Sequence, residues 1–195
     1  MSEKGYTMGM LSGREPFTDG GRPTELTVTD YWSFQHSNID HNPEYVAEFL
    51  VAKSLGKERP DNDKTWTLFD ITYRGKRIEV KETSFWHPLN EPGKVSNRRS
   101  FSIQKVRGYG EVPVRNNDIY VFCLLTGETP EEAWPLELSH WEFYVVRTNE
   151  IDELFGDQRS VALSRIRKIC HPVPYARLRD VIDAAIDAIE TYEQK

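Results

Sequence analysis

A continuous apolar run, Ile119 to Leu125, constrains the fold more than any other feature of the chain. The run is too short for most helices and lacks the apolar–polar alternation of a half-exposed strand, so it predicts a strand buried on both faces. Such a strand lies at the centre of a sheet and needs a covering layer on each side. We therefore expect an α/β fold with a mixed central sheet flanked by helices.

A helix is expected from Asn42 to about Gly56. Asn42 is a favourable N-cap, Pro43 suits the first helical position, and the carboxylate of Glu44 suits the first turn because of the helix dipole. The positions expected to face the core are Val46, Phe49 and Leu50. Another side of the helix carries Glu44, Ala47, Glu48 and Val51. One side is thus expected to pack and another to present carboxylates.

Further strands are expected on both sides of the central one. Residues 66–73 and 77–85 are rich in β-forming residues and are joined by a Gly-containing connector, which indicates a hairpin. The pattern of residues 101–106 does not discriminate between a strand and a short helix, and we assign it to a strand. Residues 141–146 supply another strand. Together these segments provide the neighbours that a central strand requires.

Two helices are expected after the last strand. Asn149 is placed as the cap of a short helix that ends at Phe155. From Pro174 onward, apolar residues recur at helical spacing and predict an amphipathic helix that covers the sheet. Its apolar stripe consists of Leu178, Val181, Ile182, Ala185, Ile186 and Ile189.

Length and composition indicate one main domain. The chain has 195 residues, of which 38% are hydrophobic and 12% aromatic, enough to build a core. Residues 1–30 are rich in Gly and show no sustained period, so we expect a flexible N-terminal arm before a single domain over residues 31–195. The sequence contains no long apolar run, no secretory signal and no CxxC pair. We therefore expect a cytoplasmic protein with no membrane partner.

Charge is unevenly distributed along a chain whose net charge is −6. Residues 94–115 carry six basic side chains and one acidic side chain, and residues 159–179 carry six basic side chains and no acid. Such segments could contact a phosphate backbone, or they could be ordinary solvated surface. The distribution therefore permits a nucleic-acid partner but does not establish one.

Three ionisable residues lie in the expected hairpin. Glu79 and Lys81 alternate with Ile78 and Val80, so their side chains share one face of the strand while the apolar pair faces the core. Asp70, on the preceding strand, can bring a second carboxylate to the same place. Partly buried acids are costly unless they are paired or bound to a cation. The grouping therefore indicates a functional site.

The chemistry of these side chains favours a divalent metal. Asp70 and Glu79 supply the hard oxygen ligands that Mg²⁺, or Mn²⁺ in its place, prefers. Lys81 could position an attacking water, help to deprotonate it, and offset the charge that builds on phosphorus in the transition state. A helix carboxylate at Glu44, or at its rival Glu48, could hold a metal-bound water or a second ion. The implied reaction is hydrolysis of a phosphodiester.

Asp70 followed by Glu79-Val80-Lys81, after a helix that bears Glu44, resembles the PD-(D/E)xK nuclease superfamily, the restriction-endonuclease-like fold. The resemblance covers about residues 42–125. The order of the motifs also resembles that of uncharacterised bacterial members of the superfamily. It implies that Asp70, Glu79 and the backbone carbonyl of Val80 hold the metal. It also implies that Lys81 is the catalytic lysine and Glu44 the helix acid. The chain departs from the family at Phe69, where a Pro is usual, and at residues 107–118, which are short for a crossover helix.

The resemblance implies a Mg²⁺-dependent, endonuclease-like phosphodiesterase that acts on nucleic acid, with DNA favoured over RNA. It further implies a role in restriction, defence or repair. Weaker candidates for contacting the nucleic acid are Arg98, Arg99, Gln104, Lys105 and Arg107. A homodimer is favoured because symmetric partners would place one site on each strand of a duplex. The alternative is a catalytically silent module of the same fold that binds nucleic acid or a protein partner, and metal binding would discriminate between the two.

Overall fold

The computed structural model describes residues 12–19, 21–36, 43–57, 68–86, 99–107, 112–129 and 132–193. The chain forms two compact units, Met1–His41 and Asn42–Lys195. The first unit contains an antiparallel pair of strands, β1 (Pro16–Asp19) and β2 (Arg22–Thr27), followed by helix α1 (Val28–His36). The central sheet and the candidate site belong to the second unit.

The described residues of the first unit form strands and a helix, where we expected a flexible arm over residues 1–30. All four residues of β1 and five of the six in β2 are exposed, so no apolar face marks these strands in the sequence. Helix α1 begins with a reciprocal cap, in which Thr27 N donates to Asp30 Oδ2 (2.8 Å) and Asp30 N donates to Thr27 Oγ1 (3.3 Å). The boundary between the units follows His41 rather than residue 30.

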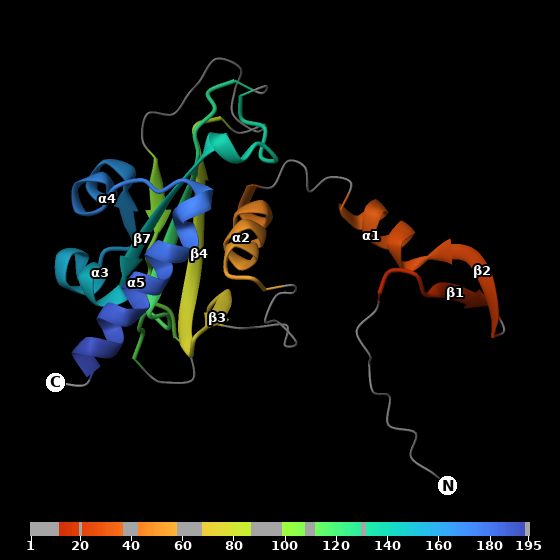
Figure 1. Ribbon diagram of the computed structural model, residues 1–195, viewed down its shortest axis with the longest axis horizontal. Helices are drawn as coiled ribbons and strands as arrows, with labels where there is room; N and C mark the ends of the chain where they lie inside the picture. Colours follow the sequence, from red (N-terminus) through yellow and green to blue (C-terminus); the bar gives the residue numbers. More distant parts are fainter. Residues whose placement is uncertain are drawn as a thin grey trace, which may run out of the picture. The chain divides into compact units, whose positions relative to one another are not determined.

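The second unit is built on a mixed four-stranded sheet with the order β3-β4-β6-β7 (Figure 1). Its strands are β3 (Ile71–Tyr73), β4 (Lys76–Ser84), β6 (Ile119–Leu125) and β7 (Trp141–Arg147). Strands β4 and β6 are parallel, and the other two pairs are antiparallel. Every residue of β6 is buried, which confirms a central strand covered on both faces. The expected α/β class with a mixed central sheet is therefore confirmed.

The hairpin of β3 and β4 turns through Arg74 and Gly75. Both residues have positive φ angles, 48° and 75°, as a two-residue turn between right-twisted strands requires. Gly adopts this conformation without a steric cost, whereas Arg74 is held in it and pairs with Asp183 and Asp187 of helix α5 (Tyr175–Glu193). The expected hairpin thus forms, but its first strand is shorter than residues 66–73: β3 begins at Ile71, and residues 68–70 precede it as bends. Residues 66 and 67 lie outside the described ranges.

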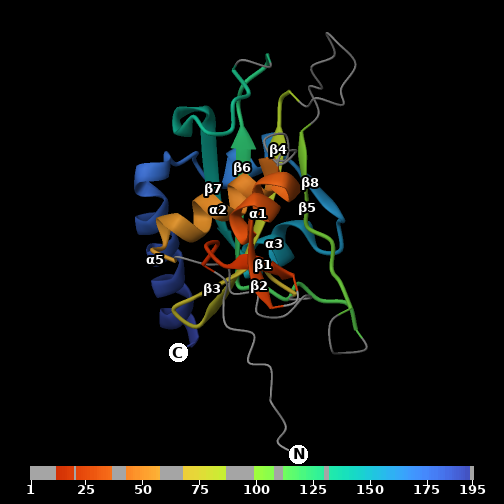
Figure 2. The same cartoon turned by 90° about the vertical axis from the view of Figure 1, so that its right-hand side faces the viewer.

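The two faces of the sheet are covered by different layers. Helix α2 (Pro43–Ser54) lies against β4 and α5 lies against β7, and both share one apolar cluster with the sheet. The other face carries α3 (Thr148–Phe155), α4 (Leu163–Ile169) and an antiparallel pair of β5 (Ser100–Ser102) with β8 (Ser160–Ala162) (Figure 2). Burial of Leu178, Ile182 and Ile186 confirms the stripe that was expected for the C-terminal helix.

The strand expected over residues 101–106 does not join the central sheet. Strand β5 is shorter and pairs with β8, outside the central sheet, with Phe101 opposite Val161. Val106 then forms an isolated bridge with Val114. The described residues between β5 and β6 contain no helix, so the connection from β4 to the parallel strand β6 differs from a crossover through a helix.

Two helix predictions need correction in detail. In α2 the buried side includes Ala47, Leu50 and Val51, whereas Phe49 is 56% exposed. The packed side is therefore rotated toward the carboxylate-bearing side, which brings Glu48 against the sheet. Helix α3 begins at Thr148, one residue before the expected cap Asn149. None of the helices in the described ranges is long and apolar enough to cross a membrane.

Candidate active site

The candidate site forms where β3 begins and β4 continues beyond it. Strand β3 pairs only with Lys76–Ile78 at the start of β4. The rest of β4 runs on past the first residue of β3, and helix α2 packs against β4 (Figure 1). Side chains from the start of β3, from the middle of β4 and from α2 therefore meet at one sheet edge.

Asp70 lies at this edge, directly before β3. Its backbone N–H donates to the Ile78 carbonyl (3.1 Å), and its carboxylate oxygen Oδ2 accepts from the backbone N–H of Val80 (2.7 Å). The N–H and C=O of one strand residue project to the same edge, so the Val80 carbonyl also faces Asp70. Burial raises the pKa of Asp70, with a further contribution from the charge of Glu44, and these effects outweigh the Val80 hydrogen bond and Lys81.

Glu79 and Lys81 are joined by an ion pair. Lys81 Nζ lies 2.5 Å from Glu79 Oε1, and both side chains are largely buried. Burial and the charge of Asp70 raise the pKa of Glu79. Burial alone lowers the pKa of Lys81, but the carboxylates of Glu79, Asp70 and Glu44 outweigh it, so the pKa is raised. Lys81 is therefore a charged ammonium held among acids.

The structure brings both rival helix acids to the site. Glu44 is exposed on α2 and Glu48 is half-buried one turn later. Burial, together with the charges of Asp70 and Glu44, raises the pKa of Glu48 to about 7. Glu44 in turn contributes to the raised pKa values of Asp70 and Glu79. Both carboxylates therefore belong to one electrostatic cluster, in which Glu48 is the more deeply placed.

Glu82 is a fifth acidic residue near the site, and it was not singled out from the sequence. Its oxygen Oε1 is buried and has no hydrogen-bond partner among the described residues. Burial, together with the charge of Glu44, raises the pKa of Glu82 to about 7. Side chains alternate along a strand, so Glu82 is expected on the same side as Ile78 and Val80, which face the core. In the structure Glu82 lies opposite Cys123 of β6.

The donor chemistry of this cluster fits a divalent cation. In the described ranges no three His, Cys, Asp or Glu side chains are grouped to enclose a metal ion. Mg²⁺ does not need such a cage, because it usually takes one or two carboxylates and retains several waters. Asp70, Glu79 and the Val80 carbonyl offer such a partial set of oxygens. Burial is the main cause of the raised pKa values of both acids, and a bound cation would favour their charged forms.

The weaker nucleic-acid candidates are not gathered in one place. Arg98 lies outside the described ranges. Gln104 accepts two hydrogen bonds from Arg159 (3.2 and 3.0 Å), and Lys105 pairs with Asp157 (2.8 Å). Arg107 is exposed. Arg99 lines a cavity on the face of the sheet that β5 and β8 cover.

Comparisons with known proteins found no matching family model, no matching curated protein and no matching solved structure.

Glu48→Gln is expected to stabilise the protein at pH 8 in EDTA. The pKa of Glu48 is raised to about 7 in the folded chain, whereas a glutamate in an unfolded chain titrates near 4.3. The folded state binds the extra proton between these values, so the wild-type free energy of unfolding falls as pH rises through this range. Glutamine avoids the loss, and we expect a gain of about 1 kcal/mol because water screens the exposed part of the carboxylate.

Urea denaturation at pH 5 and pH 8 measures this effect. Glu153→Gln, at an exposed position of α3, is the matched control and should leave the difference between the two pH values unchanged. Equal pH dependence of wild type and Glu48→Gln would show that Glu48 does not share the charge of the cluster.

Proposed function

We propose that the protein is a Mg²⁺-dependent phosphodiesterase that cleaves nucleic acid, with DNA as the first substrate to test. The observation that carries this proposal is the meeting of Asp70, Glu79 and Lys81 at one free edge of β4, with Asp70 fixed by the Val80 N–H. Two hard carboxylates beside a buried ammonium suit a reaction in which negative charge develops on a phosphoryl group.

Each residue has a distinct part in the proposed reaction. Asp70, Glu79 and the Val80 carbonyl would hold the metal ion, which supplies Lewis-acid activation of the phosphodiester and of a water. Lys81 is charged in this environment, so we assign it the stabilisation of developing negative charge rather than proton abstraction as a neutral amine. Glu48, with its pKa near 7, can accept a proton from the attacking water, and Glu44 orients water at the exposed rim.

The restriction-endonuclease-like fold is part of the same proposal. Support comes from the order of helix α2, the β3–β4 hairpin and the parallel strand β6, with the acids at the start of β3 and in β4. The β5 strand, which pairs with β8 beyond the central sheet, is a departure. It lies on the face opposite to α2 and does not separate Asp70 from Glu79.

Cleavage assays with supercoiled, linear and single-stranded DNA test the proposal. We expect cleavage with Mg²⁺ or Mn²⁺ and none in EDTA, because the two carboxylates repel each other and the phosphodiester until a cation joins them. Binding of DNA without cleavage in either metal, and without measurable Mn²⁺ binding, would instead support a catalytically silent binding module.

A further inference from the structure

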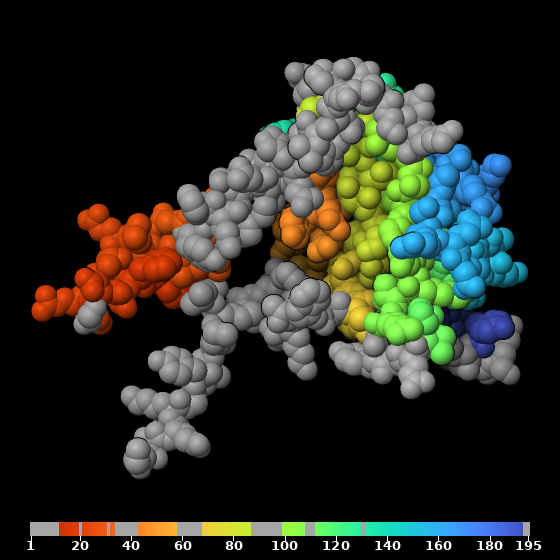
Figure 3. All heavy atoms as spheres, turned by 180° about the vertical axis from the view of Figure 1, so that it is seen from behind, coloured from red at the N-terminus to blue at the C-terminus, as the bar shows by residue number. Residues whose placement is uncertain are grey.

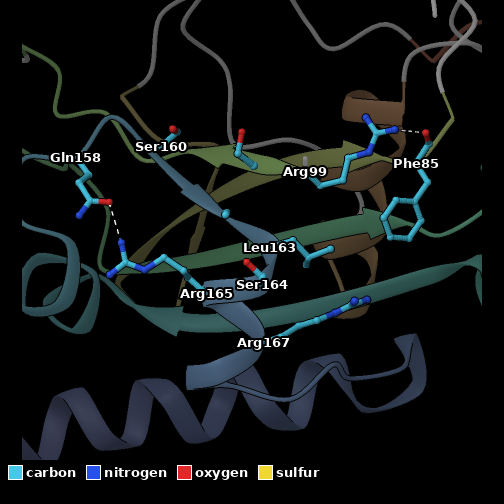
Figure 4. A pocket seen from close by; sticks show the side chains of 10 residues that line it. Phe85, Arg99, Gln158, Ser160, Leu163, Ser164, Arg165 and Arg167 are labelled. Atoms are coloured by element: carbon cyan, nitrogen blue, oxygen red, sulfur yellow. Dashed lines mark hydrogen bonds between the residues drawn. The ribbon is translucent and has the colours of Figure 1, made fainter. Parts of the chain in front are cut away.

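A cavity of about 860 Å³ lies on the face of the sheet that carries β5, β8 and α4. Its wall combines arginine and serine side chains with the apolar side chains of Phe85 and Leu163. Figure 4 shows Arg99 and Phe85 at one end, Arg165 and Gln158 at the other, and Ser160, Leu163 and Ser164 between them. The cavity thus has a cation at each end and hydroxyl groups along its length.

Two of the cavity's three arginines have no carboxylate ion pair within the described ranges. Arg165 Nη1 donates to the amide oxygen of Gln158 (3.1 Å), and its guanidinium lies 4.5 Å from the ring centroid of Phe155. Arg99 donates to the Phe85 carbonyl, and its Nε is buried without a hydrogen-bond partner among the described residues. Arg99 is attracted by the nearby Glu82 carboxylate, although the two form no ion pair. Arg167 pairs with Glu142 (2.8 Å). The positive charge of the cavity is therefore least compensated at Arg165 and partly compensated at Arg99.

These features specify an anionic ligand with separated charges. Guanidinium groups bind phosphate through paired N–H donors, and apolar walls strengthen the attraction by excluding water. Serine hydroxyls supply further donors along the wall. The volume lies in the range of pockets that hold drug-sized molecules, so it accommodates more than one phosphate ion but excludes a duplex. A short single-stranded stretch with successive phosphates matches this description.

The cavity and the acidic site share strand β4. Phe85 directly follows β4 and is four residues beyond Lys81, a separation of about 13 Å along an extended strand. A nucleic-acid strand covers that distance in about two to four nucleotides, depending on how far it is extended. Figure 3 shows α2, β4, β5 and the β8–α4 segment in order across one side of the molecule. One strand could therefore contact both places.

We propose that this cavity binds backbone phosphates of a single-stranded segment that adjoins the bond cleaved at the acidic site. The inference rests on the proposed function and makes it more specific, because it assigns a single-stranded segment to the substrate. Arg99 and Arg165 bind the phosphates, and Ser160 and Ser164 line the path between them.

Fluorescence anisotropy with labelled hexathymidylate in EDTA tests the proposal without cleavage. Arg165→Gln should weaken binding by about tenfold, because one charge-assisted hydrogen-bonding partner is lost. Ser164→Glu keeps every arginine but places a negative charge in the cavity, and we expect a larger loss of affinity. The matched control is Lys168→Gln, on the same helix, exposed and outside the cavity wall. Thermal unfolding confirms that each variant is folded.

The outcomes separate this proposal from that of the nuclease. Affinity that is unchanged in both Arg165→Gln and Ser164→Glu overturns the cavity proposal even if the wild type cleaves DNA with Mg²⁺. Binding that depends on Arg165, in a protein that never cleaves, supports the cavity and removes the nuclease. Thymidine monophosphate and a thymidine dinucleotide with a 5′-phosphate are then compared as competitors of hexathymidylate. If both compete equally well, the assignment to a strand is overturned, because one nucleotide is enough to occupy the cavity.

Discussion

Lys81→Met is expected to lower the rate of metal-dependent cleavage by about 10²–10³-fold, the usual effect of removing one group that stabilises transition-state charge. Methionine retains an unbranched apolar stem, so the largely buried position stays filled. What is lost is the ammonium that lies 2.5 Å from Glu79 Oε1. The measurement is the single-turnover cleavage rate of the DNA form that the wild type cuts best.

Metal affinity separates a chemical role of Lys81 from a structural one. The ammonium repels a cation, and Asp70 and Glu79 remain in the variant, so Mn²⁺ binding measured by calorimetry should be retained or strengthened. Lys168→Met, at an exposed position of α4, should leave both the rate and the affinity unchanged. An undiminished rate in Lys81→Met would remove Lys81 from the reaction. Loss of Mn²⁺ binding would show that Lys81 serves to position the carboxylates.

Arg115→Met is expected to lower the free energy of unfolding by about 3 kcal/mol, the effect of leaving buried acceptors without their donor. The Arg115 side chain has no exposed surface and bridges three segments. Its Nε donates to the Ile103 carbonyl (2.8 Å), its Nη2 to the Gln158 carbonyl (3.2 Å), and its Nη1 to Asp152. The midpoint of thermal unfolding should fall by about 10 °C.

This prediction tests whether the basic residues of 94–115 act together on nucleic acid. Arg159→Met is the control, since Arg159 is exposed and its guanidinium donates to the side chain of Gln104 at the surface. We expect an effect within about 0.5 kcal/mol. An Arg115→Met protein that keeps its stability but binds hexathymidylate more weakly would contradict the structural role. It would instead support a direct contact between Arg115 and phosphate.

Local geometry explains why the core of the site could be predicted from the sequence. Asp70, Glu79 and Lys81 lie within one hairpin, so the alternation of side chains and a short turn bring them together with no long-range information. The burial of Glu48 could not be obtained in this way. Helical spacing places Glu44 and Glu48 on one side, but the rotation of α2 against the sheet depends on what packs beside Ala47 and Val51.

Charge along the chain was a poor guide to charge in space. The windows 94–115 and 159–179 each carry six basic residues, yet their arginines have different surroundings. Arg115 is buried among carbonyl groups, Arg167 is paired with Glu142, and Arg99 and Arg165 line a cavity. Pairing of β5 with β8 brings the two windows together, and this contact links segments far apart in the chain.

Periodicity within short segments was enough to predict the strand Ile119–Leu125, the hairpin that holds Asp70, Glu79 and Lys81, and the amphipathic helix at the C-terminus. Long-range packing sets the pairing of β5 outside the central sheet, the burial of Glu48 and the cavity between Arg99 and Arg165. These features depend on which faces of distant segments pack together, and local periodicity identifies a face without identifying its partner.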